Sequence, residues 1–166
     1  MPFSDETLAL AARVVEVARA ADARITTAES CTGGLIAGAI TAVSGASHVF
    51  SRGFVTYANE AKSELLGVDP AVIARVGAVS EDVARAMAEG ARRAAGAPAA
   101  VAVTGIAGPG GGSAKKPVGL VHVAAARGRR PTLHERHVYS GDRASIRAQA
   151  VDAALRLLLH AMGEKA

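Results

Sequence analysis

The segment TAESCTGG, residues 27–34, places a hydroxyl group and two glycines between a predicted strand and a predicted helix. A serine in this position can act as a nucleophile, and free backbone N–H groups at the start of the helix can bind an anion or a developing oxyanion. We therefore predict that Ser30 is a nucleophile and that the amides of Thr32, Gly33 and Gly34 stabilise an oxyanion. On the local sequence alone, the alternative is that Ser30 caps the helix and the glycines only form the turn.

The segment RGFVTYANEAK, residues 52–62, supplies a candidate base. Tyr57 should end a strand, and Lys62 should lie in the first turn of a helix that Asn59 caps. The positive end of that helix and burial would both lower the pKa of Lys62, whereas the carboxylate of Glu60 would oppose this effect. A neutral lysine can remove the proton of a serine nucleophile. The alternatives are that Lys62 is a solvated surface residue and that Tyr57 packs at the strand end.

Two further segments have the composition of binding elements. The glycine-rich loop GIAGPGGGS, residues 105–113, could hold a phosphate or a ribose, although it lacks the Gly-Lys-Ser/Thr ending of a P-loop. A flexible connection is the alternative for this loop. In the segment SGDR, residues 140–143, Arg143 could bind a phosphate through two parallel hydrogen bonds, or it could pair with Asp142.

Cys31 is the only cysteine, so an internal disulfide is impossible. A thiolate at the start of a helix is chemically plausible, which makes Cys31 a rival nucleophile to its neighbour Ser30. We expect no metal and no cofactor, because one cysteine and the spacing of the histidines do not suggest a metal site. No Ser-His-Asp arrangement is apparent, which favours a serine assisted by a lysine. The five histidines are His48, His122, His134, His137 and His160.

The chain has 166 residues, of which 50% are hydrophobic, and this predicts a single globular domain over residues 1–166 with an aliphatic core. The net charge of +4 suits a phosphorylated metabolite as well as a nucleic acid, but the scarcity of aromatic residues argues against binding of single strands. No apolar stretch reaches the length of a membrane span, and no signal peptide is apparent. We therefore expect a cytoplasmic protein with no membrane and no nucleic-acid partner.

Hydrophobic periodicity predicts strands that alternate with helices, which indicates a layered α/β domain with a mixed, mostly parallel sheet. In such sheets, binding sites form at the carboxyl ends of the strands, where the candidate residues fall. Helices are expected from about residue 5, over 35–43, over 59–66, from 70, over 80–96 and over 142–162. Strands are expected over residues 24–28, 53–57, 99–104, 118–126 and 132–139.

Five stretches of the chain, between about residues 25 and 143, resemble the C-terminal domain family of the competence/damage-inducible protein CinA. They are TTAESCTGGLIAGAIT, SRGFVTYANEAKSELLGV, GAVSEDVARAMAEGAR, AVTGIAGPGGGSAKKPVGLV and YSGDR. This resemblance implies three α/β/α layers around a mixed sheet. Some members of the family carry a second, N-terminal domain, for which this chain has no room, so it resembles the stand-alone form.

The resemblance also implies an activity, which is the hydrolysis of nicotinamide mononucleotide to nicotinate mononucleotide and ammonia in pyridine nucleotide salvage. It implies Ser30 as the nucleophile, with Tyr57 and Lys62 as its catalytic partners, and a homodimer or larger homo-oligomer. We assign substrate binding, on the same resemblance, to Glu29, Thr104, Gly105 and Arg143. The alternative is a non-catalytic nucleotide-binding or interaction module related to competence or DNA damage.

Overall fold

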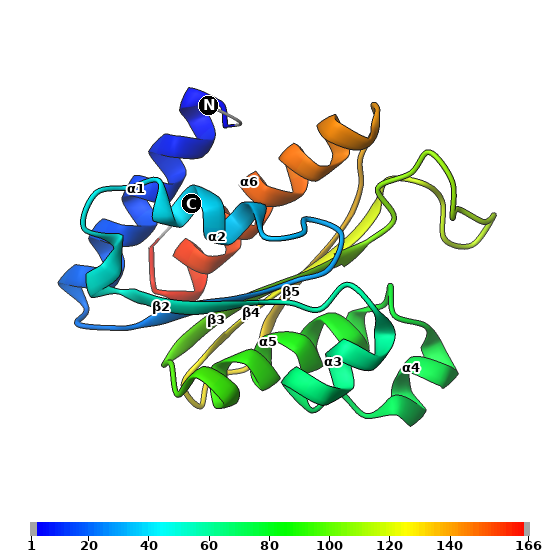
Figure 1. Cartoon of the computed structure of the whole chain (residues 1–166), viewed down its shortest axis with the longest axis horizontal. Coiled ribbons are helices and arrows are strands. Elements are labelled where there is room, and N and C mark those ends of the chain that lie inside the picture. The colour runs from blue at the N-terminus through cyan, green and yellow to red at the C-terminus, as the bar shows by residue number, and fades with distance from the viewer. Residues whose placement is uncertain (1–2, 165–166) are drawn as a thin grey trace.

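A five-stranded sheet forms the centre of the protein, and helices cover both of its faces (Figure 1). The computed structural model describes residues 3–164. The strands lie in the order β2-β1-β3-β4-β5, where β1 is parallel to β2 and β3, and β4 is antiparallel to β3 and β5. All strands except β4 therefore point in the same direction, which confirms the predicted mixed, mostly parallel sheet. Their bounds are β1 Ile25–Glu29, β2 Phe50–Val55, β3 Ala99–Gly105, β4 Leu120–Arg127 and β5 Leu133–Val138.

The helices form the two outer layers, so the expected three-layer α/β/α arrangement is confirmed. One layer contains α1, α2 and α6, and the opposite layer contains α3, α4 and α5 (Figure 1). A 3-10 turn, η1 (Ala46–His48), precedes β2. No helix among residues 3–164 is long and apolar enough to cross a membrane. The helices are α1 Asp5–Ala20, α2 Leu35–Thr41, α3 Asn59–Leu66, α4 Pro70–Val76, α5 Glu81–Ala95 and α6 Arg143–Ala161.

The central strand β3 divides its side chains between the two cores. Val101 and Val103 belong to the core under α1 and α6, whereas Ala100 and Ala102 belong to the core under α5. This alternation follows from the two-residue period of a strand. Small alanines on the second face let α5 pack close to the sheet, and the carboxyl ends of β1 and β3 are thereby brought next to the start of α5.

A glycine in α5 also determines where α3 lies. A Cβ atom on Gly90 would sit 2.0 Å from the backbone oxygen of Leu66, so only a residue without a side chain allows this approach. Leu66 is the last residue of α3, the helix that carries Lys62. The close contact between α3 and α5 therefore helps to place Lys62 above the edge of the sheet.

Two details of the expected elements are wrong. The second strand ends at Val55, so Tyr57 lies beyond it, and it begins at Phe50 rather than at Gly53. Asn59 is the first residue of α3 and not its cap, because Ala58 occupies the cap position and provides no side-chain hydrogen bond. The bounds of β2 do not follow from hydrophobic alternation, because β2 is an edge strand and most of its side chains are exposed.

Candidate active site

The side chains of Ser30 and Lys62 meet at the carboxyl end of β1. Ser30 follows directly after the buried strand β1, and its amide donates to the carbonyl of Val103 at 3.0 Å, which continues the pairing with β3. Lys62 comes from α3, and its Nζ lies 3.0 Å from Ser30 Oγ. Both are withdrawn from solvent, with exposed fractions of 9% for Ser30 and 1% for Lys62. The structure thus brings the predicted nucleophile and the predicted base into direct contact.

The surroundings of Lys62 favour its neutral form. Its Nζ also contacts the carbonyl oxygens of Thr56 at 2.8 Å and of Tyr57 at 3.4 Å, and all three acceptors are uncharged. Burial lowers the pKa of Lys62, and the charge of Glu60 opposes this only in part. A neutral amine has two N–H groups and one lone pair. The two N–H groups can serve the carbonyl oxygens while the lone pair accepts the proton of the Ser30 hydroxyl.

Tyr57 takes a different position from the one expected for a proton relay. Its side chain is 62% exposed, and its hydroxyl accepts a hydrogen bond from Arg143 Nη2 at 3.1 Å. Only its backbone carbonyl reaches Lys62. Because Lys62 contacts Ser30 directly, no relay through the Tyr57 hydroxyl is needed.

Arg143 joins the glycine-rich loop to Tyr57 across the mouth of the site. It is the first residue of α6, and its Nη1 donates to the carbonyl of Gly108 at 2.8 Å. Ser30, Lys62, Tyr57 and Arg143 all line one cavity of about 290 Å³. Four segments distant in the sequence therefore form the walls of a single pocket. The alternative pairing of Arg143 with Asp142 is not what holds the guanidinium.

Thr104 and Gly105 line the same cavity at the end of β3. The Thr104 hydroxyl donates to the carbonyl of Ala78 at 2.9 Å and so fixes the loop between α4 and α5, which forms another wall. A Cβ atom on Gly105 would lie 2.8 Å from the Val121 side chain and 2.9 Å from the Leu120 oxygen, so the backbone can pass here only as glycine. Thr104 and Gly105 therefore both line the pocket, and their contacts within the protein hold the walls of the pocket in place.

Glu29 does not line the cavity, contrary to the role assigned to it. Its carboxylate is fully buried and accepts hydrogen bonds from the amides of Gly34 (3.1 Å), Ile36 (3.0 Å) and Ala37 (2.9 Å). A carboxylate at this place satisfies the free N–H groups at the start of α2. Glu29 therefore anchors α2 behind the nucleophile and is not available to a substrate.

The oxyanion role predicted for Gly33 and Gly34 is also wrong. The Gly33 amide donates to the Ser30 carbonyl at 3.1 Å, and the Gly34 amide is bound by Glu29. Both glycines have positive φ values, 59° and 100°, so they are needed for the shape of the turn. The amide of Thr32 has no acceptor within residues 3–164, but Thr32 is fully buried and does not line the cavity.

Cys31 is buried at the wall of the cavity, and burial raises the pKa of its thiol to about 11. A thiol with this pKa is protonated at neutral pH and is a poor nucleophile. The electrostatics of the site therefore favour Ser30 over Cys31.

Arg147, which was not predicted from the sequence, lies one helical turn after Arg143 on α6. Its Nε donates to the carbonyl of Cys31 at 3.0 Å, and its Nη2 donates to the carbonyl of Thr32 at 3.1 Å. The signal that could have identified it is its spacing of four residues from Arg143, which places both side chains on one face of the helix.

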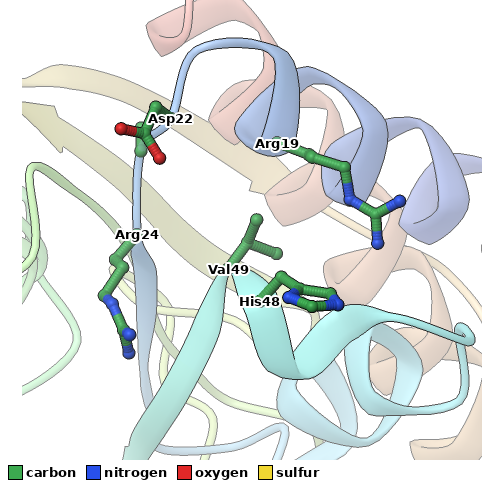
Figure 2. Close-up of a pocket in the computed structure, with 6 residues that line it drawn as sticks. Arg19, Asp22, Arg24, His48 and Val49 are labelled. Atoms are coloured by element: carbon green, nitrogen blue, oxygen red, sulfur yellow. The ribbon is translucent and has the colours of Figure 1, made fainter.

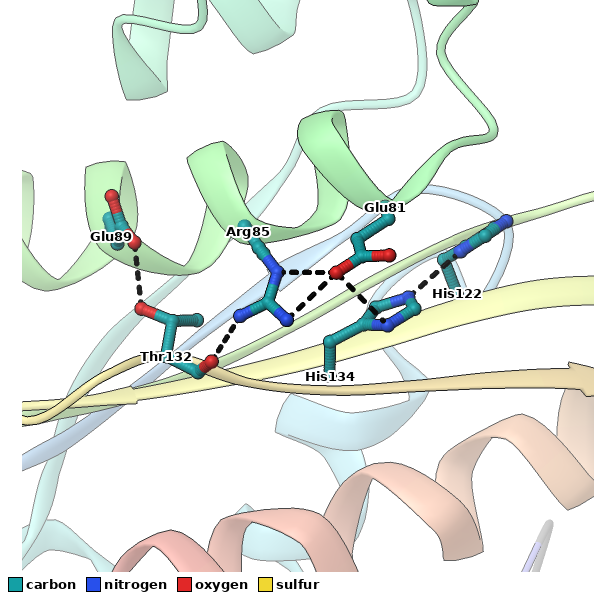
Figure 3. A network of polar contacts seen from close by, with 6 residues as sticks. All are labelled: Glu81, Arg85, Glu89, His122, Thr132 and His134. Carbon is teal, nitrogen blue, oxygen red and sulfur yellow. Dashed lines mark hydrogen bonds and ion pairs between the residues drawn. The ribbon is translucent and has the colours of Figure 1, made fainter.

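A network of polar side chains lies next to the cavity, between the sheet and α5 (Figure 3). His122 is directly opposite Thr104 in the pairing of β3 with β4, and its Nδ1 is 2.9 Å from His134 Nε2. The other nitrogen of His134 is 3.7 Å from Glu81, which also binds Arg85. Burial lowers the pKa of His122 to about 4 and also lowers that of His134. The network ties the start of α5 to the sheet while both imidazoles are neutral.

A larger cavity of about 690 Å³ lies at the opposite end of β1 (Figure 2). It is lined by Arg19, Asp22, Arg24, His48 and Val49, and the charged residues among them are exposed. This lining, in the described part of the chain, contains no serine, cysteine or lysine. Among residues 3–164, no group of three or more His, Cys, Asp or Glu side chains could hold a metal ion. The cavity around Ser30 is therefore the candidate active site.

A buried serine–lysine pair in a pocket at the edge of an α/β/α sheet is an arrangement in which a hydrolase can use serine as nucleophile and lysine as its base. The model of the CinA C-terminal domain family matches residues 7–162, and the chain belongs to this family.

Several known proteins are similar to this chain. The nicotinamide-nucleotide amidohydrolase PncC of Escherichia coli (strain K12) is 49% identical over 153 residues, which cover 92% of this chain and 93% of that protein. The protein of the same name from Pseudomonas putida is 51% identical over 155 residues, or 93% of this chain and 96% of that protein. The crystal structure of the competence/damage inducible protein CihA from Agrobacterium tumefaciens superposes with a TM-score of 0.94, at 47% identity and 98% coverage of each chain.

Proposed function

We propose that this chain is a nicotinamide-nucleotide amidohydrolase, which hydrolyses nicotinamide mononucleotide to nicotinate mononucleotide and ammonia in pyridine nucleotide salvage. The observation that carries the proposal is the 3.0 Å contact between Lys62 Nζ and Ser30 Oγ inside a cavity that both residues line. The names and the close similarity of the two PncC relatives support the choice of substrate.

In the proposed mechanism, Ser30 Oγ attacks the carbonyl carbon of the nicotinamide amide while its proton passes to the neutral Lys62. The tetrahedral intermediate collapses, the C–N bond breaks, and the lysine proton goes to the leaving ammonia. A water molecule then attacks the ester on Ser30 and gives a proton to Lys62, which returns it to Ser30. The burial that lowers the pKa of Lys62 makes this base available at a pH below the ordinary lysine range.

We assign the binding of the phosphoribosyl group to Arg143 and the glycine-rich loop. The guanidinium has five N–H donors, of which two are engaged by Gly108 and Tyr57. The remaining three are sufficient for a phosphate held by two parallel bonds. Binding energy from the phosphoribosyl group would orient the amide at Ser30. Loss of this binding should therefore lower kcat as well as raise KM.

The remaining features of the proposal concern the protein as a whole. We propose that the chain acts as a single domain in the cytoplasm, as a homodimer or larger homo-oligomer, and without a nucleic-acid partner. The continuous five-stranded sheet supports a single domain. Exposed apolar side chains at Val55 and Leu65 supply surface for contacts between subunits. Light scattering on the purified protein tests the oligomeric state, and a filter-binding assay over a range of salt concentrations tests the absence of binding to DNA.

The activity is tested by incubation of the purified protein and its Ser30→Ala variant with nicotinamide mononucleotide. We expect equal amounts of nicotinate mononucleotide and ammonia from the parent and none from the variant, which should still bind the substrate. If the parent binds the mononucleotide tightly and releases no ammonia, the chain is a nucleotide-binding module instead. If Ser30→Ala keeps nearly the parental rate, Ser30 is not the nucleophile.

A further inference from the structure

Arg147 holds the turn that carries the nucleophile from the side of α6. Its two hydrogen bonds go to consecutive carbonyl oxygens, those of Cys31 and Thr32, which directly follow Ser30. A planar guanidinium can hold two acceptors in a fixed geometry, which a lysine cannot do. The direction of two successive peptide units in this turn is therefore set by one side chain.

The direction of a carbonyl also fixes that of the amide on the same peptide unit. A trans peptide is planar, and its C=O and N–H groups point in opposite directions. The unit that joins Cys31 to Thr32 has its carbonyl on Arg147, so the Thr32 N–H points away from α6. Cys31 itself lines the cavity, whereas Thr32 is fully buried and does not line it.

Thr32 has donor groups that the rest of the protein leaves unused. The residue is fully buried, and its N–H has no acceptor within residues 3–164, unlike the amides of Gly33 and Gly34. Its hydroxyl oxygen also has no partner there. A buried donor without an acceptor costs about 1–3 kcal/mol, and the two hydrogen bonds from Arg147 hold the turn in this conformation against that cost.

We infer that Arg147 is a positioning residue for the attack by Ser30: by holding the carbonyls of Cys31 and Thr32, it fixes the turn that keeps Ser30 Oγ against Lys62 Nζ. This inference rests on the proposed function. It assigns to Arg147 a task distinct from that of Arg143, because Arg143 contacts the glycine-rich loop and Tyr57, where the distal part of the substrate would bind.

The test compares Arg147→Ala, Arg147→Lys and a matched control, Arg156→Ala, in the ammonia-release assay. Arg156 is also on α6, but it is exposed and pairs with Glu6. Misplacement of a nucleophile by about 1 Å can lower the rate by about 100-fold, so we expect a loss of kcat of this size for Arg147→Ala, with a KM within about threefold of the parent. Arg147→Lys keeps the charge and should still lose about tenfold in kcat. Arg156→Ala should match the parent.

Two additional measurements separate orientation from a merely structural role. Guanidinium ion at tens of millimolar should restore part of kcat to Arg147→Ala but not to Arg147→Lys. Melting curves show whether each variant is folded. If Arg147→Ala is not folded, the kcat of Arg147→Lys decides whether the inference holds. Parental kcat in Arg147→Lys would overturn the inference, because a charge or packing role would then suffice. So would a rise in KM alone, which would place Arg147 with the binding residues.

A second assay keeps the inference separate from the choice of substrate. Phenylmethanesulfonyl fluoride can sulfonylate Ser30, which forms an O–S bond, releases fluoride and leaves the proton on Lys62. If the parent releases no ammonia but is labelled on Ser30, the proposed function fails, and slower labelling of Arg147→Ala and Arg147→Lys than of Arg156→Ala still supports the positioning role. Equal labelling rates would contradict it. A parent that is neither active nor labelled would refute both proposals.

Discussion

Glu60 and Lys62 lie together in the first turns of α3, and the carboxylate of Glu60 acts on the pKa of Lys62 in the opposite direction to burial. Removal of this charge in Glu60→Gln should lower the pKa of Lys62 further, because the ammonium loses a favourable interaction. The neutral base then forms at lower pH, so the rising acid limb of kcat/KM should move to lower pH. Ammonia release measured across pH checks this.

The control for this prediction is Glu64→Gln, which removes an exposed carboxylate one turn further along the same helix. The acid limb of kcat/KM in Glu64→Gln should lie at the same pH as in the parent. An acid limb in Glu60→Gln that moves to higher pH would contradict the role of Lys62 as the base.

Cys31→Ala should keep most of the catalytic rate. The thiol has a pKa of about 11, so it is protonated under the conditions in which Lys62 can be neutral. Its removal from a buried position should cost about 1 kcal/mol of stability through lost packing. Steady-state kinetics and urea unfolding of the variant provide the measurements. Complete inactivation with an intact fold would instead identify Cys31 as the nucleophile.

Glu29→Gln should destabilise the protein by about 2 kcal/mol. The carboxylate accepts three backbone hydrogen bonds at the start of α2, and an amide group of the same shape presents N–H donors to some of these N–H groups. Since Gly34 is among the donors, the turn after Ser30 should be disturbed and activity should fall as well. Urea unfolding gives the free energy, and a variant as stable as the parent would show that the three bonds contribute nothing.

Stability should decrease as the pH falls from about 6.5 to about 4, because His122 has a folded-state pKa of about 4. The unfolded chain takes up a proton on this residue near pH 6.5, and the folded protein does not. The unfolded state thus binds more protons in this window, and the loss can reach about 3 kcal/mol. The pKa of His134 is lowered too and adds in the same direction.

The measurement is the free energy of unfolding in urea at several pH values for the parent and for His122→Asn. The difference between the two proteins isolates His122 from the other groups that titrate over the same pH range. The variant should show the shallower dependence on pH. If the free energy of unfolding depends on pH in the same way in both proteins, protonation of His122 is not linked to folding.

The elements that carry Ser30 and Lys62 could be predicted from the sequence because they follow from local features. The buried strand before Ser30 and the glycines after it define a strand–turn–helix unit, and the helix that carries Lys62 begins shortly after the neighbouring strand β2. Parallel strands bring their carboxyl ends to one edge of the sheet, but the sequence left open whether the two side chains meet there, since this depends on how α3 packs.

The roles of Glu29 and Arg147 could not be predicted because they depend on the direction of individual side chains. Successive residues of a strand face opposite sides of the sheet, so Glu29 turns toward α2 while Ser30 turns toward α3. The proximity of Glu29 to Ser30 in the sequence was therefore misleading. The partners of Arg147 are separated from it by 115 and 116 residues, and only the packing of α6 brings them into contact.

The reversed direction of β4 has a consequence for how this protein can change. Because β3 and β4 are antiparallel, the glycine-rich connection leaves the sheet and returns to it at the same edge. Two hydrogen bonds of 2.8 Å close the base of this connection. The Ile106 N–H donates to the Leu120 carbonyl, and the Gly119 N–H donates to the Ile106 carbonyl. A crossover between parallel strands would instead have to pass through a helical layer. Residues 109–115 of this connection are exposed, so they can be lengthened, shortened or exchanged without repacking either layer, whereas Ala107 belongs to the core under α1 and α6. The tip of the loop is therefore a replaceable module for altering what the pocket accepts.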